Sequence, residues 1–144
     1  LINAMNKVQS QNVSSTASIS MAASVEALNG DQSFILSNNE SFLRRRNLVV
    51  KHLNETPGLS CRTPEGAFYV FPSCKGVLGK TTQSGKKLSK DSDFMDYLLE
   101  EVGVAGVQGS AFGLEGFFRI SYATSDSILE DACQRIKEAC AKLS

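Results

Sequence analysis

The sequence predicts an α/β fold, a two-layer α+β sandwich in which a small, mostly antiparallel sheet carries helices packed on one face. Three observations predict this class. Apolar residues recur at helical spacing through most of residues 1–54, paired strand-like segments follow, and an amphipathic helix closes the chain. A length of 144 residues with 42% hydrophobic content is enough for a domain with its own core.

The first third of the chain predicts three helices. Residues 1–11 place their apolar side chains on one helix face. A second helix, rich in Ala and Ser, ends at Asn29 and Gly30, a typical C-terminal stop. A third spans residues 31–54, and its three consecutive arginines at 44–46 favour a solvated face.

The remaining residues predict the order strand, strand, helix, strand, strand, helix. A turn at Pro64 to Gly66 separates the first two strands. Ser127 and Glu130 match a capping box at the start of the closing helix. The longer elements are expected at residues 67–71, 93–101, 104–107, 117–123 and 127–143.

Charge and cysteine content exclude several partner classes. Fifteen basic side chains balance fifteen acidic ones, which argues against nucleic-acid or membrane-surface binding. The sequence contains no 18-residue apolar run and no charged-then-apolar leader, so a cytoplasmic protein is expected. The four cysteines form no C-x-x-C pair and no zinc spacing, so we expect buried structural thiols and no metal site.

Two motifs suggest more chemistry than their context supports. Gly79, Lys80 and Thr81 supply the second half of a phosphate-binding loop, but Cys74 stands where the first glycine belongs. The polar residues that follow carry no apolar helix stripe, which favours a solvated, mobile loop. His52, the only histidine, lacks a Ser or Cys partner and is expected at the surface of a helix end.

Arg119 is the strongest candidate for a functional side chain. Strand alternation places Phe118, Ile120 and Tyr122 on the core face and Arg119 on the opposite face. An always-charged guanidinium that is partly buried needs an anion. Two interpretations remain open: a structural salt bridge to a carboxylate of this chain, or a bidentate clamp for the carboxylate of a ligand.

Several motifs occur together in a known order and spacing. "NVSSTASISMAASVEAL" is followed by "PEGAFYVFPS", then by an acidic helix, "GVAGVQGSAFG" and "FFRISYATS". This pattern resembles the C-terminal part of class I aminotransferases, pyridoxal-phosphate enzymes of fold type I, and is most similar to bacterial-type aspartate aminotransferases. The resemblance implies that residues 31–144 form the C-terminal small domain and that residues 1–30 are connecting helices from a large domain upstream.

The resemblance also implies roles for individual residues. The family's arginine in "RISYA" binds the substrate α-carboxylate, and Arg119 occupies that position. Phe68 matches an aromatic residue close to the active site, although plain core packing remains an alternative for it. Asn12, Ser14 and Ser15 match a polar turn near the dimer interface and the active site. The chain departs from the family pattern at Val13, Met21, Gly106 and Gln108.

The family's remaining chemistry is expected outside this sequence. No lysine here lies in the family's Schiff-base motif, so we expect no catalytic and no cofactor-binding residue in this chain, and no activity from it alone. The resemblance implies a homodimeric parent enzyme that moves an amino group from L-aspartate to 2-oxoglutarate with pyridoxal 5'-phosphate. Two alternatives are a stand-alone α/β regulatory module that binds a free amino or keto acid, and a plain interaction domain.

Overall fold

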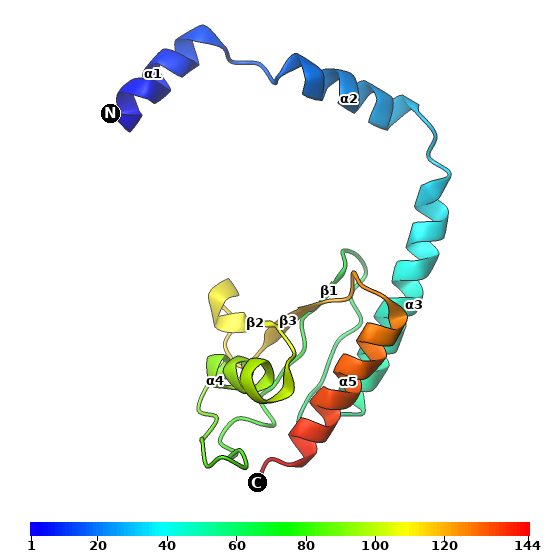
Figure 1. The fold of residues 1–144 in the computed structure, drawn as a ribbon, viewed down its shortest axis with the longest axis vertical. Helices are drawn as coiled ribbons and strands as arrows, with labels where there is room; N and C mark the ends of the chain where they lie inside the picture. The colour runs from blue at the N-terminus through cyan, green and yellow to red at the C-terminus, as the bar shows by residue number, and fades with distance from the viewer. The chain divides into compact units, whose positions relative to one another are not determined.

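The computed structural model describes every residue from Leu1 to Ser144, in two compact units, Leu1–Ser37 and Asn38–Ser144. The helices α1 (Ile2–Asn12) and α2 (Ser18–Asn29) belong to the first unit, and α3 (Phe34–Asn54) begins there and continues into the second (Figure 1). The three predicted N-terminal helices are therefore present. The predicted boundary between residues 30 and 31, which concerns the domains of a longer protein, stays a prediction.

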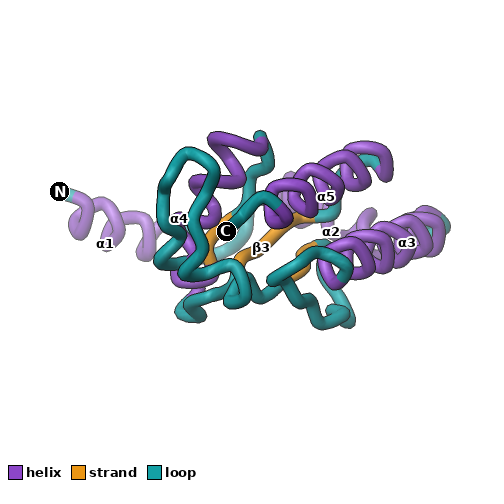
Figure 2. The backbone as a smooth tube through the Cα atoms, turned by 90° about the horizontal axis from the view of Figure 1, so that it is seen from below, coloured by secondary structure: helices purple, strands orange, loops and turns teal.

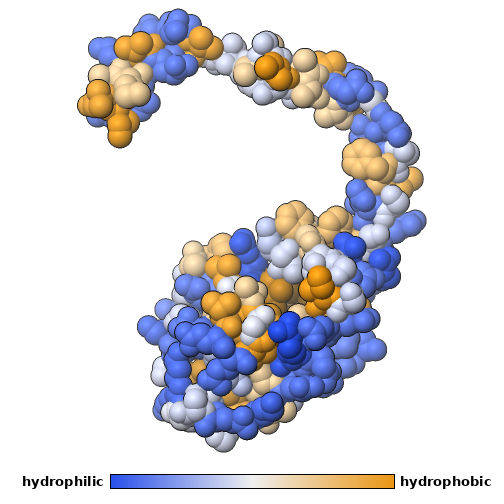
Figure 3. All heavy atoms as spheres, in the orientation of Figure 1, coloured by the Kyte–Doolittle hydropathy of each residue, from blue (hydrophilic) through white to orange (hydrophobic).

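The helices α1 and α2 expose every one of their residues. The predicted apolar stripe of the first helix lies open at the surface, as the orange residues of α1 in Figure 3 show. The helix α2 ends at Gly30 as predicted, and the Gly30 amide donates to the Glu26 carbonyl oxygen at 2.7 Å. Within the first unit, neither helix has a buried core of its own.

The second unit is built around a three-stranded antiparallel sheet of order β1-β3-β2. Its strands are β1 (Tyr69–Val70), β2 (Val107–Gln108) and β3 (Phe118–Ser121). The central strand β3 pairs Ser121 with Tyr69 on one side and Arg119 with Val107 on the other. The strands β1 and β3 lie within the predicted segments but are shorter, and β2 overlaps its predicted segment, 104–107, only at Val107. The segment before Pro64 contributes only an isolated bridge between Ser60 and Ser73.

Helices and two long loops, residues 55–68 and 71–90, account for the rest of the second unit. The predicted helix at 93–101 is divided into α4 (Asp91–Tyr97) and a π-helical turn, η1 (Leu98–Val102). The turn η2 (Gly109–Phe112) is a 3-10 helix between β2 and β3, and α5 (Asp126–Ala141) closes the chain. In the view of Figure 2, α4 is seen to the left of β3, and α3 and α5 are seen to its right.

The predicted capping box at the start of α5 is wrong. The helix begins one residue before Ser127, with Ser125 at the N-cap and no side-chain cap hydrogen bond. The Ser127 hydroxyl lies 3.3 Å from the Ser125 hydroxyl instead. The first helical residue, Asp126, accepts hydrogen bonds from Arg44 and Arg45 of α3, so a tertiary contact fixes this helix end.

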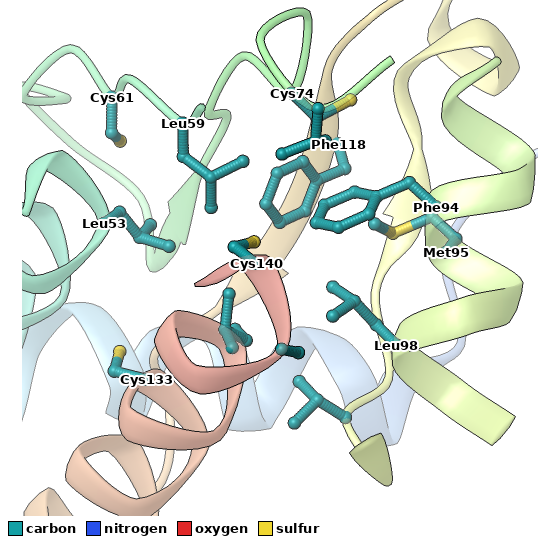
Figure 4. Packing of buried hydrophobic residues seen from close by; sticks show 14 of the residues in the cluster. Leu53, Leu59, Cys61, Cys74, Phe94, Met95, Leu98, Phe118, Cys133 and Cys140 are labelled. Atoms are coloured by element: carbon teal, nitrogen blue, oxygen red, sulfur yellow. The ribbon is translucent and has the colours of Figure 1, made fainter. Parts of the chain in front are cut away.

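The core of the second unit lies between the sheet and the helices α3, α4 and α5. Phe118 and Tyr122, on the predicted core face of β3, are 0% and 2% exposed. The Phe118 ring meets Phe94 of α4 edge-on at 5.4 Å, and Leu53 of α3 approaches the same region (Figure 4). The four free cysteines also lie in this core, as predicted.

The loop at residues 73–92 is more ordered in its packing than predicted. Val77 and Leu88 are completely buried, and a bridge between Thr81 and Lys87 closes the loop on itself. The expectation of a solvated loop holds for residues 83–87, which are exposed, but not for the whole loop, because two isolated apolar residues without any periodicity anchor it. No helix follows directly after Lys80 and Thr81, in agreement with the argument against a phosphate-binding loop.

Two structural findings concern membranes and metals. None of the helices combines the length and apolarity needed to cross a bilayer. The structure contains no cluster of three or more His, Cys, Asp or Glu side chains that could hold a metal ion.

Candidate functional site

The Arg119 side chain lies between two aromatic rings. Its Cζ atom is 4.4 Å from the centroid of the Tyr69 ring and 4.6 Å from that of the Phe112 ring. Tyr69 comes from β1 and Phe112 from η2, so three separate segments meet at this guanidinium. Cation–π contacts use the π faces of the rings and not the N–H donors of the guanidinium, which stay available for a planar partner.

No carboxylate of this chain pairs with Arg119. The ion pairs of the structure use other arginines and lysines, and none of the side-chain hydrogen bonds involves the Arg119 guanidinium. Within this chain, the salt-bridge interpretation of Arg119 is therefore wrong. The side chain is partly buried yet its charge has no internal counter-ion, an arrangement that favours an external anion.

A hollow of about 190 Å³ adjoins the Arg119 side chain. It contains no lysine and no acidic residue, and its lining consists of Tyr69, Ala105, Gly106, Val107, Arg119 and Ser121. A Cβ atom at Gly106 would lie 2.9 Å from Sδ of Met95 and 3.3 Å from the Arg119 carbonyl oxygen. The departure from a β-branched residue at Gly106 thus has a packing reason, because this strand approaches α4 and β3 closely.

The turn η2, which carries Phe112, is tied to the central strand. The Gly109 amide donates to the Phe117 carbonyl oxygen at 2.7 Å, and the Leu114 amide donates to the Gly109 carbonyl oxygen at 3.0 Å. A Cβ atom at Gly109 would overlap the Leu114 carbonyl oxygen. Glycine is therefore the residue that lets the turn lie this close to β3.

Phe68 does not line the Arg119 hollow itself, although it lies beside Tyr69, which does. Its side chain is 42% exposed, so plain core packing does not describe it. Its ring lies 6.2 Å from Phe42 and 4.5 Å from Tyr69, and it lines a second hollow of about 550 Å³ together with Arg46, Glu65 and Tyr122, among others. Its predicted position near an active site stays a prediction.

The residue before Phe68 has a strained backbone. Ala67 has a φ of 60°, in the left-handed region that a non-glycine residue seldom adopts. The Tyr122 hydroxyl donates to the Ala67 carbonyl oxygen at 2.8 Å, and burial raises the pKa of Tyr122, so this donor stays protonated. The core face of β3 therefore fixes the turn from which Phe68 projects.

The remaining predicted site residues belong to the first unit. Asn12 is the last residue of α1, and Ser14 and Ser15 follow it in the connection to α2. All three are exposed and none makes a side-chain hydrogen bond. Their role near an interface stays a prediction.

The three consecutive arginines of α3 are structural anchors. Arg44 and Arg45 both donate to Asp126, at 2.7 and 2.9 Å. These hydrogen bonds, that from Arg44 foremost, lower the pKa of Asp126 to about 2. Arg46 donates to the Pro64 carbonyl oxygen at 3.1 Å. The predicted solvated face therefore holds α5 and the turn before β1 in place.

Sequence reasoning missed Tyr69 and Phe112 as neighbours of Arg119. Tyr69 could have been found, because alternation along residues 67–71 places it on the opposite face from the buried Val70. Phe112 lies in a glycine-rich turn without periodicity, so the sequence carries no comparable signal for it.

The comparison with protein families shows to which family the chain belongs. The family model described as aminotransferase class I and II matches residues 1–136. The chain belongs to the class I and II aminotransferase family. The predicted resemblance is thereby confirmed for nearly the whole chain.

Two curated relatives are similar to this chain over its whole length. The aspartate aminotransferase of Rhizobium meliloti (strain 1021) is 60% identical over 144 residues, which are 100% of this chain and 35% of the relative. The aspartate/prephenate aminotransferase of Cereibacter sphaeroides is 54% identical over 144 residues, 100% of this chain and 36% of the relative. The chain thus spans about a third of the length of these curated relatives.

A solved structure confirms the predicted fold class. The crystal structure of the aspartate aminotransferase from Rhizobium meliloti superposes with a TM-score of 0.88 at 60% identity, covering 99% of this chain and 36% of that chain. The fold is that of the matching part of fold type I, pyridoxal-phosphate-dependent aminotransferases.

Proposed function

We propose that this aminotransferase chain is the C-terminal, substrate-carboxylate-binding part of an enzyme that moves an amino group from L-aspartate to 2-oxoglutarate with pyridoxal phosphate. The observation that carries the proposal is the Arg119 guanidinium, which lies between two rings and has no internal counter-ion. The names of the Rhizobium and Cereibacter relatives support aspartate as the amino donor.

Arg119 binds and orients the substrate in this proposal. Its planar fork donates two parallel hydrogen bonds to the α-carboxylate of the amino acid or the 2-oxo acid. The flanking Tyr69 and Phe112 rings restrict rotation of the guanidinium, so the carboxylate approaches along one edge. A carboxylate held at two points fixes the direction of the α-carbon, which lowers the entropic cost of reaching the reactive geometry.

The residues of this chain do not form a pyridoxal phosphate site. No lysine lines the hollow beside Arg119. Two lysines of the second unit have contacts elsewhere: Lys80 donates to the Leu143 carbonyl oxygen at 3.4 Å, and Lys75 lies over the Phe117 ring at 5.1 Å. The Schiff-base lysine and the cofactor contacts belong to an upstream part of the protein in this proposal, and the 144-residue chain alone is inactive.

The proposal extends to the setting of the whole enzyme. Its partners are an amino acid and a 2-oxo acid, with no nucleic acid and no membrane, and it acts as a cytoplasmic homodimer. Asn12, Ser14 and Ser15 lie near the subunit interface and active site, and Phe68 lies at the edge of the substrate site. The resemblance and the exposed position of these residues support this assignment.

A second candidate is a regulatory module that binds a free amino or keto acid. It is favoured by the location of Arg119, Tyr69 and Phe112 within one unit that has its own core. Such a module would bind carboxylates without any cofactor.

One experiment distinguishes the two candidates. The 144-residue chain and the protein extended upstream to its initiator methionine are compared for cofactor absorbance and for transamination of L-aspartate with 2-oxoglutarate. The aminotransferase proposal expects cofactor binding and turnover from the extended protein only. An extended protein that binds no pyridoxal phosphate, together with aspartate binding by the 144-residue chain in calorimetry, would favour the regulatory module.

A further inference from the structure

Asp91 is the one charged residue in the buried core of the structure. It is the first residue of α4 and is 2% exposed. Its carboxylate accepts a hydrogen bond from the Ser110 amide at 2.7 Å and one from the neighbouring Ser92 amide at 3.0 Å. A buried carboxylate is costly unless its hydrogen bonds compensate, so the bond to Ser110 needs a structural or functional reason.

Capping of α4 does not supply that reason. Asp93, two residues further along, already accepts hydrogen bonds from the Ser89 and Lys90 amides at 2.9 and 3.1 Å. The bond from Ser110 to Asp91 instead crosses from α4 to the turn η2, over 19 residues of sequence. It therefore ties one element of the fold to another.

The turn that Asp91 holds carries one wall of the Arg119 site. Ser110 and Phe112 belong to the same four-residue 3-10 helix, which the Gly113 amide closes by donating to the Ser110 carbonyl oxygen at 3.1 Å. The residue before Ser110, Gly109, ties the same end of the turn to Phe117, the residue that precedes β3. Since the start of the turn is held at two adjacent residues and the Gly113 amide closes it onto Ser110, the Phe112 ring is held 4.6 Å from the Arg119 guanidinium.

We propose that Asp91 is a positioning residue for substrate-carboxylate binding, which acts through Ser110 and Phe112 on the orientation of the Arg119 guanidinium. This inference rests on the proposed role of Arg119. When the Asp91 bond is lost, the turn is held only through Gly109, Phe112 moves more freely, and Arg119 gains rotamers that binding must then restrict. Such a loss of preorganisation weakens substrate and transition state equally, so it raises KM and leaves kcat nearly unchanged.

The test compares two aspartates of the same helix in the extended protein, loaded with pyridoxal phosphate. Asp91→Asn removes the charge and turns one of the two acceptor oxygens into an NH2 donor, so the Ser110 and Ser92 amides cannot both keep their partner. The replacement is expected to raise KM for L-aspartate on the order of 10-fold, with kcat changed by less than about 2-fold. Asp93→Asn is the matched control, because it makes the same change at a more exposed cap of α4 whose hydrogen bonds do not reach η2. Amide hydrogen exchange of the 109–116 peptide is expected to accelerate in Asp91→Asn only.

A double-mutant cycle with Phe112→Leu tests the pathway. Phe112 is 49% exposed, so this replacement does not threaten the fold. The single variant Phe112→Leu therefore tests the pathway even if Asp91→Asn yields too little protein. It is expected to raise KM by itself, and Asp91→Asn is expected to add little in its background. Equal KM values for the two aspartate variants, or full additivity with Phe112→Leu, would overturn the role of Asp91 while the role of Arg119 stands. Unchanged KM and kcat in Arg119→Ala would overturn both.

Discussion

The replacement Gly109→Ala tests how the turn η2 is held against the sheet. A Cβ atom at this position would overlap the Leu114 carbonyl oxygen and would lie 2.8 Å from the Phe117 carbonyl oxygen. Both obstacles are backbone atoms, which cannot rotate away as a side chain could. The turn therefore has to move away from β3.

The expected cost follows from the bonds that this movement breaks. Gly109 takes part in two backbone hydrogen bonds, to Phe117 and from Leu114. Loss of one of them costs about 1 kcal/mol, and the steric overlap adds about 1–3 kcal/mol. We expect the free energy of unfolding of the 144-residue chain to fall by about 3 kcal/mol, measured by urea unfolding with circular dichroism.

Two other glycines serve as graded controls. Gly113 has open space around it but a φ of 78°, so Gly113→Ala is expected to cost about 1–2 kcal/mol through backbone strain alone. Gly66 has open space and no positive φ, so Gly66→Ala is expected to change stability by less than about 0.5 kcal/mol. A cost for Gly109→Ala no larger than that for Gly113→Ala would refute the steric reasoning.

Four further predictions concern ionisable and strained groups. Because burial raises the pKa of the thiols to about 11 for Cys61, Cys74 and Cys133 and about 12 for Cys140, a disulfide reagent at pH 8 should label none of the four in the folded chain and all four in guanidinium chloride. Asp126 has its pKa lowered from 3.8 to about 2, so its stabilising contribution is complete above pH 3.8 and is lost as the pH falls towards 2; urea midpoints of Asp126→Asn should lack this part of the pH dependence. Tyr122→Phe removes the donor to the Ala67 carbonyl and should cost about 1 kcal/mol, whereas Ala67→Gly relieves the left-handed strain and should stabilise the chain by up to about 1 kcal/mol in the same assay.

The regular parts of the fold could be predicted because their signals are local. Alternation around Arg119 correctly separated the buried Phe118 and Tyr122 from the face that carries the guanidinium. Helical spacing located α1, α2, α3 and α5 closely, and Gly30 ended α2 as expected. These elements depend on residues three or four positions apart, which a sequence displays directly.

The parts that were missed depend on contacts between distant residues. The start of α5 is set by Arg44 and Arg45, which lie 82 and 81 residues before Asp126 in the sequence, and not by a local capping box. The loop at 73–92 is held by Val77 and Leu88, which show no period. Of the Arg119 site, the sequence indicated the arginine but not the Phe112 wall or the buried Asp91 behind it, because a loop and a helix start supply them.

The role of Arg119 is tested most directly in the extended protein with pyridoxal phosphate bound. We would compare kcat/KM for L-aspartate in the wild type, in Arg119→Ala, and in Arg62→Ala, a control that removes the same charge from an exposed side chain. Loss of a bidentate charged contact predicts a fall in kcat/KM for Arg119→Ala equivalent to about 2–5 kcal/mol, with cofactor absorbance unchanged and Arg62→Ala near wild type. A kcat/KM for Arg119→Ala within about 2-fold of the Arg62→Ala value would contradict the assignment of Arg119 as the substrate-carboxylate anchor.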